Sequence, residues 1–178
     1  MKKIFALVIA AIMILSAVGA MAATGSKSSS TISYVVPPEE PIKVVKTEDN
    51  DGTSAIKQAI IDAQANGSAI DGLPAPVKEK LGEGYVNINE METYKIEGDI
   101  DGVSDDVKLV FKFATPYPEG ETVILAIGIV PPEGEAEWLV KEGIANADGD
   151  VEVTVTKDIL DKIGDKPFVV IPVSKGEE

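Results

Sequence analysis

The sequence predicts a mainly β protein, an antiparallel immunoglobulin-like β-sandwich preceded by a short helical segment. The first observation is a change of period. Apolar residues follow a helical spacing of about 3.6 across residues 53–82 and a spacing of about 2 from Tyr85 onward. The second is the spacing of turns. Segments rich in glycine, proline and aspartate separate the later apolar runs at intervals of roughly eight to twelve residues. Short strands at that spacing are typical of a β-sandwich.

Four apolar runs are the strongest strand candidates. VKLVFKF (107–113) and VEVTVT (151–156) alternate apolar and polar residues, which predicts strands with one buried face. TVILAIGIV (122–130) is apolar on both faces and is therefore expected to be a central strand. PFVVIPV (167–173) is expected to be the last strand. Its Pro172 indicates an edge or a bulge, because proline cannot donate a hydrogen bond to a strand ladder.

Helices are expected in three places. TSAIKQAIIDAQANG (53–67) has apolar residues on one face, and Thr53 or Ser54 can cap its N-terminus. PAPVKEKLG (74–82) begins with prolines at positions that suit a first helical turn and ends at a glycine. TKDILDKIG (156–164) is expected to form about two turns between the last two strands, which is a common kind of insertion at a sandwich edge.

The N-terminus is typical of a secretory signal peptide. Two lysines precede an uninterrupted apolar stretch, and Ala20-Met21-Ala22 supplies the small residues that signal peptidase reads. We therefore expect cleavage after Ala22 and a secreted or extracellular bacterial protein. The alternative is an uncleaved membrane anchor, because the apolar stretch approaches the length that spans a bilayer.

The composition shifts along the chain define the expected domain organisation. Pro37, Pro38 and Pro41 flank two short apolar segments, Tyr34–Val36 and Ile42–Val45. Because proline cannot donate to a strand ladder, we expect these segments to be edge strands or an extended arm that docks on the main body. The expected regions are a signal peptide at 1–22, a flexible linker and proline-rich extended arm at 23–52, a helical lead-in at 53–84 and the sandwich domain at 85–178.

Charge and missing residue types exclude several classes of function. The formal net charge is −14, and the signal peptide contains lysines but no acid, so the mature chain is more acidic still. Such a chain repels phosphate backbones and anionic headgroups, so we expect no nucleic-acid binding and no membrane binding after signal cleavage. The chain has no histidine and no cysteine. It therefore has no Ser-His-Asp triad, Cys-His dyad, histidine-ligated zinc site or disulfide.

The second half of the chain resembles a known group of proteins. The similarity lies in NEMETYKIEGD, FKFATPYPEGETVILAIGIV, the pair EW and ADGDVEVTVTKDILDKIGDKPFVVIPVSK, within residues 87–175. These segments resemble small secreted proteins of anaerobic bacteria that have a C-terminal immunoglobulin-like β-domain and no assigned function. The resemblance implies export and a sandwich fold, and it carries over no catalytic or binding residue.

Acidic turns are the candidate metal sites, with calcium as the one cofactor they suggest. DIDGVSDD (99–106) departs from an EF-hand loop, because its glycine comes early and Val110 stands where the bidentate glutamate belongs. TEDNDGTSAIKQ (47–58) also lacks that glutamate. Ordinary aspartate-glycine turn chemistry is the favoured interpretation. If DIDGVSDD and NADGD (146–150) meet at one pole of the sandwich, the shared ligands are Asp99, Asp101, Asp105, Asn146, Asp148 and Asp150.

Two aromatic residues are candidates for ligand binding. Carbohydrate sites use exposed rings, and Tyr117 at an expected hairpin tip is the aromatic most expected to be exposed. Trp138 follows a proline-glycine turn, and its more common role in that position is packing at the core or rim.

The favoured functional interpretation is a secreted, non-enzymatic binding or structural module acting at or outside the cell envelope. Its faces, edge strands or proline arm would engage a protein or a wall component. The alternative is a small-ligand module for calcium or glycan that uses the acidic turns with Tyr117 or Trp138. A carboxylate-based hydrolase is the weakest option, because a short-looped sandwich offers little cleft for two carboxyl groups at a defined separation.

Overall fold

The computed structural model describes residues 34–36, 41–103 and 106–176, with side chains from residue 41 onward. The expected signal peptide at 1–22 and linker at 23–32 lie outside the described residues. Within the described part, none of the helices combines the length and hydrophobicity needed to cross a membrane.

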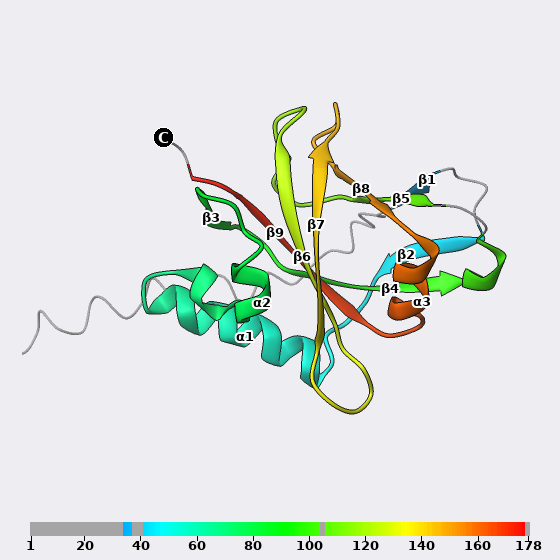
Figure 1. Cartoon of the computed structure of the whole chain (residues 1–178), viewed down its shortest axis with the longest axis horizontal. Helices are drawn as coiled ribbons and strands as arrows, with labels where there is room; N and C mark the ends of the chain where they lie inside the picture. Colours follow the sequence, from blue (N-terminus) through cyan, green and yellow to red (C-terminus); the bar gives the residue numbers. More distant parts are fainter. Residues whose placement is uncertain (1–33, 37–40, 104–105, 177–178) are drawn as a thin grey trace, which may run out of the picture. The chain divides into compact units, whose positions relative to one another are not determined.

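All the described strands belong to one antiparallel sheet, shown in Figure 1. Its order is β1-β5-β8-β7-β6-β9-β4-β2, and β3 pairs with β9 beside this path. The strands are β1 Tyr34–Val36, β2 Ile42–Lys46, β3 Tyr85–Ile88, β4 Glu92–Gly98, β5 Val107–Phe111, β6 Thr122–Ile129, β7 Glu137–Ala145, β8 Val151–Val155 and β9 Phe168–Lys175.

The mainly β character is confirmed, but the expected sandwich of two packed sheets is not. The terminal strands β1 and β2 lie near each other, so the single sheet nearly closes into a barrel. Both strands come from the proline-rich arm, and each occupies an end of the sheet, where proline is tolerated. β1 pairs with β5 and β2 with β4, so segments before the helices in sequence pair with strands that follow them.

The helical elements are α1 Asp51–Ala65, η1 Ala69–Gly72, α2 Ala75–Lys78, η2 Ile100–Gly102 and α3 Lys157–Ile163. Helix α1 begins two residues before the expected start, because Asn50 is its N-cap instead of Thr53 or Ser54. The Asn50 side chain accepts a hydrogen bond from the Thr53 amide at 2.8 Å, and the Thr53 hydroxyl accepts one from the Asn50 amide at 2.8 Å. This reciprocal pair is a capping box.

Two hydrophobic clusters lie on the two faces of the central strands. The inner cluster fills the barrel and includes Leu125 of β6, Phe168 of β9 and Leu160 of α3. The outer cluster packs α1, η1 and α2 against the opposite faces of β6 and β9, with Ile60 and Ile171 fully buried in it. Figure 1 shows α1 and α2 beside β3 and β9, with α3 on the other side of β6 and β7. The two-faced apolar pattern of 122–130 thus correctly predicted a central strand.

Strand β9 is central, although Pro172 suggested an edge or a bulge. One neighbour is β6, in which Leu125 faces Pro172. On its other side β9 pairs with two strands in succession. β4 pairs with its first part, where Glu92 faces Val170, and β3 pairs with its last part, where Ile88 faces Val173. Three residues of the β3–β4 segment therefore stand opposite Ile171 and Pro172. The extra residue lies in the segment 89–91 between β3 and β4, and the proline is accommodated where the ladder is interrupted.

Candidate functional site

The first acidic turn forms an exposed 3₁₀ turn with no ligand cage. Asp99 and Asp101 belong to or flank η2, and both are exposed. The Asp101 carboxylate lies 3.7 Å from the Lys157 ammonium group of α3. Asp105 lies outside the described residues. The described acids of this turn therefore face solvent and a lysine.

The second acidic turn is organised by Asn146. The Asn146 side-chain oxygen accepts hydrogen bonds from the amides of Asp148 and Asp150, each at 3.0 Å. Asp148 is exposed, whereas Asp150 is only 5% exposed. Burial raises the pKa of the Asp150 carboxyl above its ordinary value, although the positive charge of Lys112 opposes the shift. The Asn146 side chain thus holds the turn, whereas the sequence favoured aspartate-glycine chemistry, in which an aspartate bonds its own backbone.

The two acidic turns do not share a pole. In the β5–β8 ladder Val107 faces Val155, and Phe111 faces Val151. The Asp99–Asp101 turn precedes the Val107 end, and the NADGD turn precedes the Val151 end, so roughly 14 Å of paired strand separates them. Within the described part of the chain, no group of three or more acidic residues is placed to hold a metal ion. The hypothesis of one shared cation therefore has no geometric support.

Tyr117 is buried, and the expectation that it is exposed was wrong. Its residue is 8% exposed, and its ring packs edge-on against Phe113 with centroids 5.9 Å apart. Its amide donates to the Gly149 carbonyl at 3.1 Å, which attaches the loop to the NADGD turn. Burial and the negative charge of Glu90 raise the pKa of the phenol. The ring belongs to the end of the barrel core and is no platform for a sugar.

Trp138 is a half-buried packing residue on the outer face of β7. It packs against the outer cluster, directly across from Gly128 of β6. A side chain added at Gly128 would come within 3.1 Å of the indole and of Ile56 in α1, so the glycine makes room for both. Tyr117 and Trp138 lie in different clusters and near opposite ends of β6, so they do not form one binding surface.

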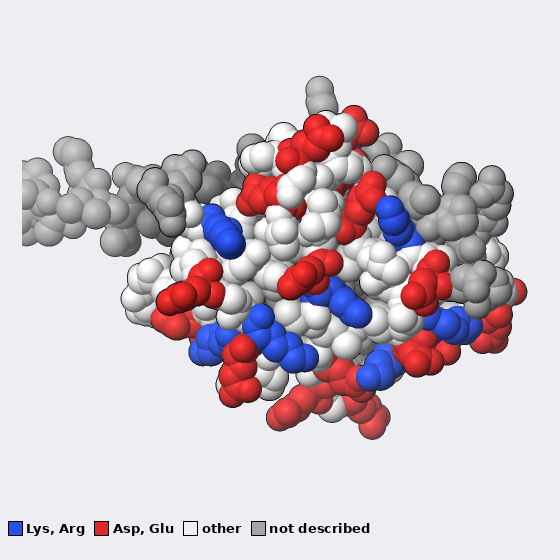
Figure 2. All heavy atoms as spheres, turned by 45° about the horizontal axis from the view of Figure 1, so that its top comes forward, with Lys and Arg blue, Asp and Glu red and all other residues white. Residues whose placement is uncertain are grey.

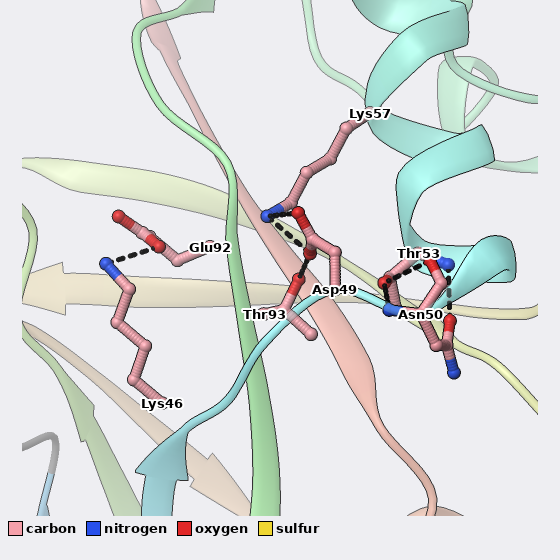
Figure 3. A network of polar contacts seen from close by, with 7 residues as sticks. All are labelled: Lys46, Asp49, Asn50, Thr53, Lys57, Glu92 and Thr93. Atoms are coloured by element: carbon pink, nitrogen blue, oxygen red, sulfur yellow. Dashed lines mark hydrogen bonds and ion pairs between the residues drawn. The ribbon is translucent and has the colours of Figure 1, made fainter. Parts of the chain in front are cut away.

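A polar junction that the sequence did not single out joins α1 to the sheet (Figure 3). Asp49 accepts hydrogen bonds from Lys57 of α1, at 3.0 Å, and from the Thr93 hydroxyl of β4. Burial alone would raise the pKa of the Asp49 carboxyl, but these two donors outweigh it and hold the pKa below its ordinary value. Within the 47–58 segment, Asp49 therefore has a structural role, because it links α1 to β4.

Two depressions on the surface of the described residues are open to solvent. One of about 410 Å³ is lined by Tyr85, Glu121 and Lys175, with the Lys175 ammonium group 5.5 Å from the tyrosine ring. Another of about 540 Å³ lies at the start of α1, between Asp51 and Asp165. The face drawn in Figure 2 carries acidic side chains with lysines interspersed, and charge of one sign does not dominate a wide area.

The longest unpaired strand edge among the described residues belongs to β7. Every residue of β7 from Glu137 to Ile144 has a partner in β6. On the opposite side β8 pairs only with Ile144 and Ala145. In Figure 1 the two strands meet near the end of β7 and diverge from there. None of the described strands pairs with residues 137–143 on that side.

The main-chain groups at this edge belong to alternate residues. The amide of Ala145 donates to the Glu121 carbonyl and its carbonyl accepts from the Gly120 amide, just before β6, whereas the Asn146 amide donates to the Asp150 carbonyl, on the β8 side. Because successive residues of a strand direct their main-chain groups to opposite sides, Trp138, Val140 and Glu142 present theirs to the open edge. Trp138, Leu139 and Val140 are also half-exposed.

Comparison with protein-family models, with curated proteins and with solved structures finds no match to this chain.

Proposed function

We propose that this protein is a secreted, non-enzymatic binding or structural module that acts at or outside the cell envelope by pairing the open edge of β7 with an extended protein segment. The observation that carries the proposal is this edge, because unpaired amides and carbonyls flanked by half-exposed apolar side chains are a template for strand addition. Export is supported by the signal-like residues 1–22.

The interior of the barrel supports a contact function over catalysis. Side chains of the inner cluster, including Phe111, Leu125 and Phe168, are fully buried there and leave the interior packed. Glu121 is the one acid lining the smaller of the two depressions described above. The larger depression has Asp51 and Asp165 in its lining, but it is open to solvent. Carboxylate-pair chemistry needs two acids at a defined separation in a cleft. We therefore propose that the protein acts through contacts at its surface and not through chemistry in its interior.

The experiment is photo-crosslinking in cells that export the full chain. A photoreactive amino acid replaces Glu142, which presents its main chain to the open edge, and in a matched control it replaces Ile61, an exposed residue of α1 that is 48% exposed. We expect a discrete protein adduct from position 142 and none from position 61. Absence of an adduct at position 142, or the same adducts from both positions, would contradict the proposal.

A further inference from the structure

We propose that the partner of the open β7 edge is β7 of a second copy of this chain, paired antiparallel about a two-fold axis with Leu139 facing Leu139. This inference rests on the proposed function of the edge and names its occupant. The pairing joins the two sheets into one sheet that runs through both copies.

The alternation of main-chain groups limits the possible registers. Trp138 and Val140 direct their amides and carbonyls to the open edge, and Leu139 directs its own toward β6. A residue whose amide and carbonyl point to the open edge must pair with a residue of the second copy whose amide and carbonyl also point to that edge. A symmetric pairing near the middle of the edge therefore centres on Leu139 or on Val140. Registers that pair Trp138 with Leu139 or Lys141 are excluded.

Side-chain complementarity selects the register centred on Leu139. In this register Glu137 faces Lys141 of the second copy, and by symmetry Lys141 faces Glu137 of the second copy. Trp138 likewise faces Val140 in both directions, which places an indole beside a β-branched side chain. Opposite charges and aromatic–aliphatic pairs are the cross-strand pairs that stabilise antiparallel sheets.

The register centred on Val140 lacks these pairs. It places Trp138 opposite Glu142, Lys141 opposite Leu139, and Glu137 opposite Gly143. Within the described residues neither Glu137 nor Lys141 forms an ion pair. The charges that the Leu139 register joins are therefore not engaged elsewhere in the described structure.

The other open edges are less suited to a second copy. β3 is a strand of four residues with a register shift against β9. The terminal strands β1 and β2 lie near each other where the barrel almost closes. β7 is longer, and its ladder with β6 is regular from Thr122 to Ile129.

Sedimentation velocity of the mature chain, residues 23–178, over a range of concentrations tests the pairing. We expect a concentration-dependent dimer. Val140→Pro removes an amide that faces only the open edge, so it should leave the β6 ladder and the circular dichroism spectrum intact and abolish the dimer.

A charge-swap experiment tests the register. Glu137→Lys and Lys141→Glu each place like charges opposite each other twice, so each should weaken dimerisation at least tenfold. A mixture of the two variants makes every such pair opposite in charge, and so does the double variant. Both should recover the dimer. Glu133→Lys, in the exposed loop before β7, changes the net charge equally without touching the edge and should leave the dimer unchanged.

A mature chain that sediments as a monomer at every concentration overturns the inference, and Lys141 is then a residue that blunts the edge against association. A dimer that survives Val140→Pro, or single variants that do not recover when mixed, also overturns it. The proposed function is tested separately, because a photo-adduct from position 142 with a different protein would leave that proposal standing while this inference fails.

Discussion

Strands β9 and β7 have similar lengths and share β6 as a neighbour, but the rest of the fold covers them to different extents. β9 is paired on both edges, lies beneath the helices on one face, lines the barrel on the other, and is buried from Phe168 to Ser174. β7 is paired along one edge and is half-exposed over Trp138–Lys141. We therefore expect β9 to contribute more to stability than β7, and the proposed contact surface lies on the less covered strand.

The largest expected effect is a loss of stability on truncating β9. Ile171→Ala removes a fully buried side chain from the outer cluster and should lower the free energy of unfolding by about 2 to 4 kcal/mol. Val140→Ala on β7 is the matched control, and it should cost less than about 1.5 kcal/mol because Val140 is half-exposed. Urea unfolding measures both. Equal losses would contradict the contrast between the two strands.

A smaller effect is expected where β7 rests on β6. Gly128→Ala places a methyl group within 3.1 Å of the Trp138 ring and of Ile56, so these side chains must shift. We expect a cost of about 1 to 3 kcal/mol and a red shift of the emission of Trp138, the only tryptophan in the chain. An unchanged emission spectrum would show that the indole does not pack over this glycine.

The junction that attaches the helical cover to the sheet should contribute less. Asp49→Asn removes the charge that Lys57 and Thr93 bind, and we expect a cost of up to about 1 kcal/mol at neutral pH, because the site is partly exposed and screened. Folding lowers the pKa of Asp49, so its contribution is present above the unfolded-state pKa and is lost as pH falls through the lower folded-state value. Thermal melts of both proteins should converge in acid.

The smallest effect is expected at Asp150, beside the short stretch where β7 does have a partner in β8. Folding raises the pKa of Asp150, so the folded state binds a proton more tightly and this residue opposes folding at neutral pH. Asp150→Asn should raise stability by less than about 1 kcal/mol at pH 7. The advantage should disappear as pH falls through the raised pKa. If Asp150→Asn is less stable than the wild type at pH 7, Asp150 favours folding and the prediction is wrong.

Local features of the fold could be predicted from the sequence. The two-faced apolar run at 122–130 identified the central strand β6, and alternation identified β5 and β8, because both patterns record which faces are buried. Helical spacing placed α1 and α3 to within two residues at their starts. Residues 146–150 form a turn as expected, but the side chain that bonds the backbone there is Asn146 and not an aspartate.

Features that depend on partners distant in the sequence could not be predicted. Alternation states which face of a strand is buried but not which strand lies beside it, so the near-closure of one sheet by β1 and β2 was missed. Tyr117 was expected at an exposed tip, but the packing of Phe113 and the bond to Gly149 bury it. The open edge of β7 arises because β8 leaves it after two paired residues, and no local pattern records that departure.

The most direct test of the account is disulfide formation by Leu139→Cys, because the chain has no cysteine of its own. In the proposed register residue 139 faces itself across a non-hydrogen-bonded pair with Cα atoms about 4.5 Å apart, which lies within the range that a disulfide accepts. Val140→Cys and Val86→Cys, the latter at a position that is 54% exposed, are the controls. We expect a covalent dimer from position 139 under mild oxidation and little from the controls. A monomer at position 139, or equal cross-linking at all three positions, would contradict it.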